Sequence, residues 1–280
     1  MKISEFLAEL KKRNTLLYLF GNLNLFVFLV CLVFYFVDQT HIMGINAWIK
    51  PMKFALSIAL YTFTFGWLLH YLQDSRKRRI ITWVVLICMT AEMAIIFYQA
   101  LRGQQSHYNI STGFNALLFS IMGAFIGINS LINFYTLVLF YLKKEVRLVG
   151  PEVSAWRMGL FLFVVGGISG GWMISQMAHT VGAPDGGPGL PFVNWSTVAG
   201  DIRVAHFITL HGLQAIPIFW FVVAARSSHP QRMVTWFSVA YVVACLLLHL
   251  LSYQAFRLFH NKTQITNTNF HKSHCLSCPL

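Results

Sequence analysis

TLLYLFGNLNLFVFLVCLVFYFV, residues 15–37, runs from Thr15 to Val37 without a single charged side chain. An α-helix rises 1.5 Å per residue, so about 20 apolar residues suffice to cross a hydrocarbon core of roughly 30 Å. The run is too long for the hydrophobic region of a signal peptide, and no small-residue cleavage site follows it. The stretch therefore predicts an uncleaved first transmembrane helix.

Further apolar runs of similar length follow along the chain. The 280 residues are 56% hydrophobic and only 11% charged, which leaves too little polar surface for a soluble domain of this length. We predict an all-α, polytopic membrane bundle of about seven transmembrane helices. The expected spans are 15–37, 52–73, 80–101, 116–142, 155–177, 203–225 and 233–258.

The positive charges predict the orientation of this bundle. The net charge is +12, but the basic residues form short clusters between apolar runs, at 11–13, 74–79, 143–147 and 226–232. This arrangement is not the continuous basic stripe of a nucleic-acid-binding protein, so the expected partner is the lipid bilayer. The positive-inside rule then places the N-terminus in the cytoplasm and the C-terminus outside, in a multi-pass protein of the inner (plasma) membrane.

Three parts of the chain are expected. Residues 1–14 form a cytoplasmic amphipathic segment, 15–258 the seven-helix domain, and 259–280 a disordered tail. The tail holds His271, His274, Cys275 and Cys278. A lone Cys-x-x-Cys half-site is a weak metal signal, and in an oxidising compartment a disulfide is an alternative.

GDIRVAHFITLHGLQ, residues 200–214, brings an acid, an arginine, two histidines and a glutamine to the mouth of one apolar segment. At about 100° per residue, Arg203, His206, His211 and Gln214 fall on one side of a helix. Polar groups inside a bilayer are costly and need a partner or a function. The pattern predicts one wall of an outward-opening polar cavity among the third, fifth, sixth and seventh spans.

The residue types suggest a membrane oxidoreductase that depends on a transition metal or haem. Imidazole and carboxylate ligands suit zinc, iron, copper or manganese, and two histidines on facing helices suit haem iron. The candidate ligands are His179, His206, His211 and His249. The candidate catalytic groups are Glu92, His107 and Asp201, with Asp201 orienting a histidine. Candidate groups for a small-molecule substrate are Gln99, Arg102, Arg203 and Gln214, whose arginines would attract an anion or a haem propionate.

Other functions fit the same residues. Glu92 and the histidines could titrate in a proton-coupled transporter or sensor, and the small residues of GGISGG, 166–171, suit helix packing in a scaffold subunit. A hydrolase built from Ser106 or Ser196, an outer histidine and Asp185 or Asp201 is a third alternative. The structural alternative is that a histidine such as His249 only bonds a neighbouring helix, while Lys50 and Lys53 extend to the membrane interface.

Four motifs together carry a resemblance to a known family. WIKPMKFALS, YQALRGQQSHYN, HTVGAPDGGPGLP and GDIRVAHFITLHGLQ resemble an uncharacterised family of bacterial multi-pass inner-membrane proteins, over about residues 47–214. The resemblance implies a bacterial inner-membrane location and no particular activity.

Overall fold

The computed structural model describes residues 3–275, without the side chains of Ile3, Lys143 and residues 254–275. The helices are α1 (Ile3–Arg13), α2 (Thr15–Val37), α3 (Ile49–Leu69), α4 (Ser75–Leu101), α5 (Gly113–Tyr141), α6 (Pro151–Ser175), α7 (Ile202–Val222) and α8 (Pro230–Cys275). Two short 3₁₀ turns, η1 (Lys143–Glu145) and η2 (Ala224–Arg226), follow α5 and α7. Two antiparallel hairpins complete the described part: β1 (His41–Ile42) with β2 (Ile45–Asn46), and β3 (Thr180–Val181) with β4 (Gly200–Asp201).

Seven of these helices are long and apolar enough to cross a membrane, which confirms the predicted polytopic all-α bundle. The spans are Thr15–Val37, Ile49–Leu69, Ser75–Leu101, Gly113–Tyr141, Pro151–Ser175, Ile202–Arg226 and Pro230–Tyr253. Large apolar side chains cover their outer faces, for example Leu131 and Ile168, each 70% exposed. Such faces suit contact with lipid tails, and the protein is a multi-pass membrane protein.

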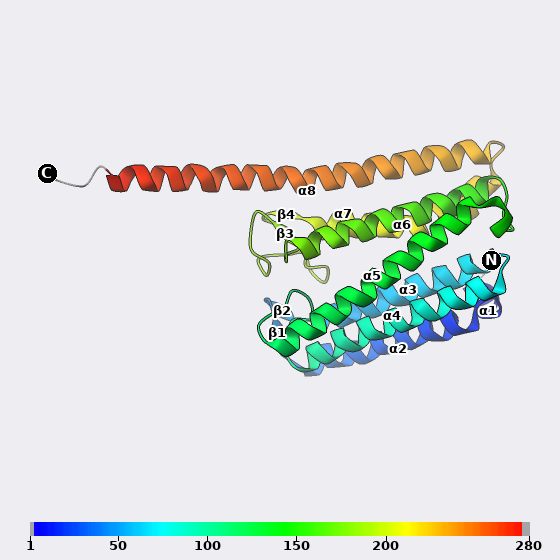
Figure 1. Ribbon diagram of the computed structural model, residues 1–280, viewed down its shortest axis with the longest axis horizontal. Helices are drawn as coiled ribbons and strands as arrows, with labels where there is room; N and C mark the ends of the chain where they lie inside the picture. The colour runs from blue at the N-terminus through cyan, green and yellow to red at the C-terminus, as the bar shows by residue number, and fades with distance from the viewer. Residues whose placement is uncertain (1–2, 276–280) are drawn as a thin grey trace.

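The segments that connect the helices lie at two opposite ends of the bundle (Figure 1). The first end, here called the basic end, holds α1 and the turns at 70–74, 142–150 and 223–229. Both hairpins lie at the opposite end, here called the hairpin end, with the loop 102–112. Because the helices alternate in direction, all four predicted basic clusters gather at the basic end.

Contacts between segments hold the basic end together. Arg13 lies over the Trp67 ring, 3.8 Å from its centroid, which fixes α1 against α3. Lys77 at the start of α4 forms a 2.8 Å ion pair with Glu145, and Leu72 pairs with Val146 in a single β-bridge. The amphipathic N-terminal helix thus packs on α3, and the turn that follows α3 is joined to the turn that follows α5.

Glycines let α6 and α7 approach closely. A Cβ added at Gly166 would lie 2.7 Å from Leu210 of α7, and one at Gly159 would lie 3.1 Å from the Gly212 carbonyl. Gly171 faces open space instead. The predicted packing role of GGISGG therefore holds for the face of Gly166 and not for that of Gly171.

Polar side chains join α3 to α5 in the middle of the bundle. The Tyr61 hydroxyl lies 3.0 Å from Asn133 Oδ1 and 3.2 Å from Asn129 Oδ1, so these two acceptors share its one hydrogen. All three residues are buried. Within the membrane such bonds replace those that water would supply. The paired asparagines of the fourth span thus bind helices together.

Helix α8 continues along its axis to Cys275 (Figure 1). No side chain after Tyr253 belongs to the described set, and Cys278 lies outside the described residues altogether. The predicted disorder of the tail and its metal-binding alternative therefore stay predictions.

Candidate functional site

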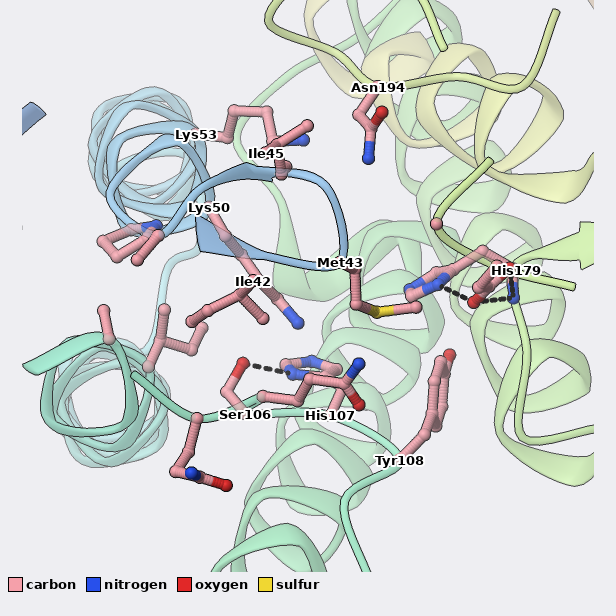
Figure 2. Close-up of a pocket in the computed structure, with 18 of the residues that line it drawn as sticks. Ile42, Met43, Ile45, Lys50, Lys53, Ser106, His107, Tyr108, His179 and Asn194 are labelled. Carbon is pink, nitrogen blue, oxygen red and sulfur yellow. Dashed lines mark hydrogen bonds and ion pairs between the residues drawn. The ribbon is translucent and has the colours of Figure 1, made fainter. Parts of the chain in front are cut away.

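Four stretches that are distant in sequence surround one cavity of about 310 Å³ at the hairpin end (Figure 2). They are residues 42–54, 96–108, 177–186 and 194–203. Each of the four motifs that carry the family resemblance supplies part of the lining. The volume falls at the lower end of the range for small-molecule sites, which is roughly 300–1,000 Å³.

Three cationic side chains reach the cavity from α3 and α7. Lys53 donates from Nζ to the Val193 carbonyl at 3.1 Å, and Arg203 donates from Nη2 to the Asn194 carbonyl at 2.5 Å. Arg203 also pairs with Asp201, the N-cap of α7. Lys50 makes no hydrogen bond or ion pair within the part of the chain described, and the charged groups around it are Lys53, Glu92, Arg203 and Asp185.

The carboxylate of Asp185 holds His179 at the wall opposite these lysines (Figure 2). His179 Nδ1 lies 2.7 Å from Asp185 Oδ2, and the backbone N–H groups of His179 and Thr180 donate to the same carboxylate. Burial alone would raise the pKa of Asp185, but these hydrogen bonds outweigh burial and hold that pKa below its usual range. Burial lowers the pKa of His179 against the opposing effect of Asp185, so the imidazole is neutral at pH 7.

The loop after α4 contributes a second histidine. His107 Nδ1 lies 3.1 Å from the hydroxyl of buried Ser106, and the His107 ring lies 5.6 Å from that of Phe54. Burial, followed by the charge of Lys50, lowers the pKa of His107 well below its ordinary value. With both histidines neutral, the net charge of the lining is positive.

Unusual backbone conformations concentrate around the cavity. Among the described residues, the non-glycine residues with positive φ are Met43, Tyr108, Met177, Phe192 and Asn194. All but Phe192 line the cavity. Non-glycine residues with positive φ are uncommon, and sparsely populated conformations cluster at functional sites. Tyr108, at φ 57°, thereby brings its ring to 4.8 Å from that of His179.

Gln99 and Arg102, two of the predicted substrate-binding residues, support the loop that forms one wall of the cavity. Gln99 donates to the Gln105 carbonyl and to Asn115 Oδ1, each at 3.1 Å. Arg102 donates to Gln99 Oε1 at 2.8 Å and to Asn115 Oδ1 at 3.0 Å. Neither side chain lines the cavity. Their bonds instead hold the loop 102–112 that presents Ser106, His107 and Tyr108.

Some of the other predicted site residues line the cavity, and some lie elsewhere in the bundle. His107, His179 and Arg203 line the cavity, and Asp201 contacts it through Arg203. Glu92 is buried in α4 outside the lining, with Lys50 as its cationic neighbour. Gln214 bonds Thr64 of α3 at 3.1 Å and does not line the cavity.

The remaining histidines make local bonds within or between helices. His206 Nδ1 contacts the Gly166 carbonyl at 2.8 Å, His211 Nδ1 the Phe207 carbonyl at 2.7 Å, and His249 Nδ1 the Cys245 carbonyl at 2.8 Å. In the described residues no group of three or more His, Cys, Asp or Glu side chains is placed to hold a metal ion. The metal or haem hypothesis for His179, His206, His211 and His249 therefore has no structural support.

Sequence reasoning underrated the two lysines and Asp185. The sequence predicts Lys50 and Lys53 at the membrane interface and offers Asp185 only as part of the hydrolase alternative. The spacing of the two lysines did carry a signal: positions 50 and 53 share a helical face, and both side chains line the cavity.

No family model, no curated protein and no solved structure matches the chain.

Proposed function

We propose that this protein binds a small organic anion in the cavity at the hairpin end, on the outer side of a bacterial inner membrane. The main support is Lys50, a basic side chain that lines the cavity with Lys53 and Arg203 and has no hydrogen bond or ion pair in the described residues. A half-buried ammonium without partners is costly, and a bound carboxylate or phosphate would satisfy it.

The rest of the lining favours an anion with an apolar body. Around the polar groups lie apolar and aromatic side chains: Ile42, Met43, Ile45, Phe54, Ile96, Tyr108 and Met177. Small-molecule sites combine such walls with a few polar groups that orient the ligand. A carboxylate with an aromatic or branched substituent therefore fits this cavity better than an inorganic ion.

The outward location follows from the charge of the opposite end. The basic end carries Lys11, Lys12, Arg13 and the basic turns, so the positive-inside rule assigns it to the cytoplasm. The hairpin end then faces outward, and the resemblance to bacterial inner-membrane proteins supports that membrane.

Binding can be tested by calorimetry on the protein in lipid nanodiscs. We expect phenylacetate to bind and its neutral analogue phenylacetamide to bind at least tenfold more weakly, because the charge meets Lys50. Lys50→Gln should remove the preference, whereas Lys12→Gln, an exposed lysine at the basic end, should leave it intact. If the wild type binds neither ligand, or both equally, the proposal is wrong.

One observation favours transport as the role of this binding. Glu92 is 4% exposed in α4, makes no hydrogen bond in the described residues and is influenced by the charge of Lys50 without forming an ion pair with it. A buried carboxyl within electrostatic range of the lysine that meets the ligand is a candidate proton carrier. Proteoliposomes with an imposed pH gradient would then accumulate phenylacetate, and Glu92→Gln would bind it without accumulation. Accumulation by both forms, or by neither, would reject proton coupling.

A further inference from the structure

Asp185 fixes where the proton of His179 lies. The carboxylate accepts from the backbone N–H of Thr180 at 2.7 Å and of His179 at 3.0 Å, so it is an ionised acceptor at neutral pH. His179 Nδ1, at 2.7 Å from the same carboxylate, must therefore be the nitrogen that carries the hydrogen.

The other ring nitrogen is then an acceptor with no partner. The neutral ring leaves a lone pair on Nε2, and no described residue donates to it. Figure 2 shows His179 on the cavity wall, near Met43 and Tyr108 and across from Lys50. A half-buried acceptor that faces a ligand cavity selects ligands with a matching donor.

We infer that the ligand is a small hydroxycarboxylate, whose carboxylate meets Lys50 and whose hydroxyl donates to His179 Nε2. The apolar body would lie against Met43 and Phe54. The inference rests on the proposed anion binding and adds His179 as the residue that determines specificity.

Three acids of nearly equal size separate the contributions of charge and hydroxyl. Mandelate carries a hydroxyl next to its carboxylate, phenylacetate lacks it, and phenylglyoxylate replaces it with a ketone that only accepts. In nanodiscs at pH 7.5 we expect mandelate to bind the wild type about five- to tenfold more tightly than either of the other two. The ketone gains nothing because its oxygen and Nε2 would both be acceptors.

Two variants report on the direction of this bond. His179→Phe keeps a ring but removes Nε2, so the three acids should bind within about twofold of one another. In Asp185→Asn the backbone N–H groups of His179 and Thr180 still donate to the amide oxygen. The amide nitrogen then faces His179 Nδ1 and donates to it. Nε2 then carries the hydrogen of the ring. The affinity for phenylglyoxylate relative to that for mandelate should therefore rise about fivefold over the wild type.

The outcomes distinguish this inference from the function on which it rests. If mandelate and phenylacetate bind the wild type equally, the inference is wrong and anion binding stands. If none of the three acids binds, both are wrong. A mandelate preference that persists in His179→Phe would also overturn the inference. The comparison of the three acids on the wild type tests the inference even if a variant does not fold. A variant whose affinity for phenylacetate is unchanged is shown to be folded.

Discussion

Arg203 and Asp201 form a charged pair where the long loop of the hairpin end, residues 176–201, enters α7. Arg203 Nη2 lies 2.6 Å from Asp201 Oδ2, and Nε lies 2.9 Å from Oδ1. Asp201 also caps α7 by accepting from the Arg203 backbone N–H at 2.9 Å, and it accepts from the Ser196 backbone N–H at 2.8 Å. One buried carboxylate thus joins the loop, the helix start and a cation of the cavity.

Asp201→Ala should destabilise the protein more than the loss of an ordinary helix cap. Removing the carboxylate takes away the cap and leaves a partly buried guanidinium without its partner, a loss of about 2–4 kcal/mol. Asp74→Ala is the matched control, because Asp74 caps α4 through two backbone N–H groups in a more exposed position. Its expected cost is about 1 kcal/mol. Unfolding in detergent with denaturant measures both, and equal losses would contradict the role of the ion pair.

Gly166→Ala should weaken the packing of α6 on α7, since the added Cβ would lie 2.7 Å from Leu210 Cδ2 and 3.1 Å from its backbone nitrogen. Overpacking of this kind costs about 1–3 kcal/mol. Gly171→Ala, on the open face of the same helix, should be neutral or slightly stabilising. Thermal unfolding of the two variants in one detergent makes the comparison. A Gly166→Ala protein as stable as Gly171→Ala would show that the helices separate without cost.

Tyr61→Phe should destabilise the centre of the bundle. The change keeps the ring but removes the donor to Asn129 and Asn133, and an unsatisfied buried acceptor costs about 1–3 kcal/mol. Tyr98→Phe, at a position 44% exposed, removes a hydroxyl without such partners and should cost less than about 0.5 kcal/mol. Chemical unfolding in detergent gives both values, and a Tyr61→Phe cost no larger than that of Tyr98→Phe would refute the role of this contact.

Acidification should destabilise the hairpin end. The pKa values of His107 and His179 are lowered by burial, so the folded state binds fewer protons than the unfolded state below about pH 6.5. Stability is therefore full above that pH and falls as pH decreases, by about 1.4 kcal/mol per pH unit for each proton taken up on unfolding. Asp185, whose pKa is also lowered, adds a further loss only below about pH 4.

A pH series of thermal unfolding from 7.5 to 5 measures this slope. His107→Gln should make the slope shallower, because one of the imidazoles that take up a proton on unfolding is removed. His41→Gln, at an exposed position of the first hairpin, should leave it as in the wild type. A stability that rises on acidification would contradict neutral histidines in the cavity.

The site was predictable in part. The acid and arginine of GDIRV and the histidines of QQSHYN and MAHTV are visible as polar residues near span ends, and the cavity does include Arg203, His107 and His179. The prediction that one side of α7 forms a cavity wall was less informative. His206 bonds α6 and Gln214 bonds α3, and neither side chain lines the cavity. Angular position on one helix cannot say which neighbour a face meets, because span order does not determine the arrangement of helices around a bundle.

The sequence by itself determined the membrane architecture, because long uncharged runs such as residues 15–37 have no stable state in water and must span as helices. It also determined the separation of charge between the two ends. Only the tertiary structure decided that Lys50 enters a cavity and that Asp185 holds the tautomer of His179. Both depend on loops that fold back over the bundle, and such contacts follow from packing between distant segments that no local periodicity encodes.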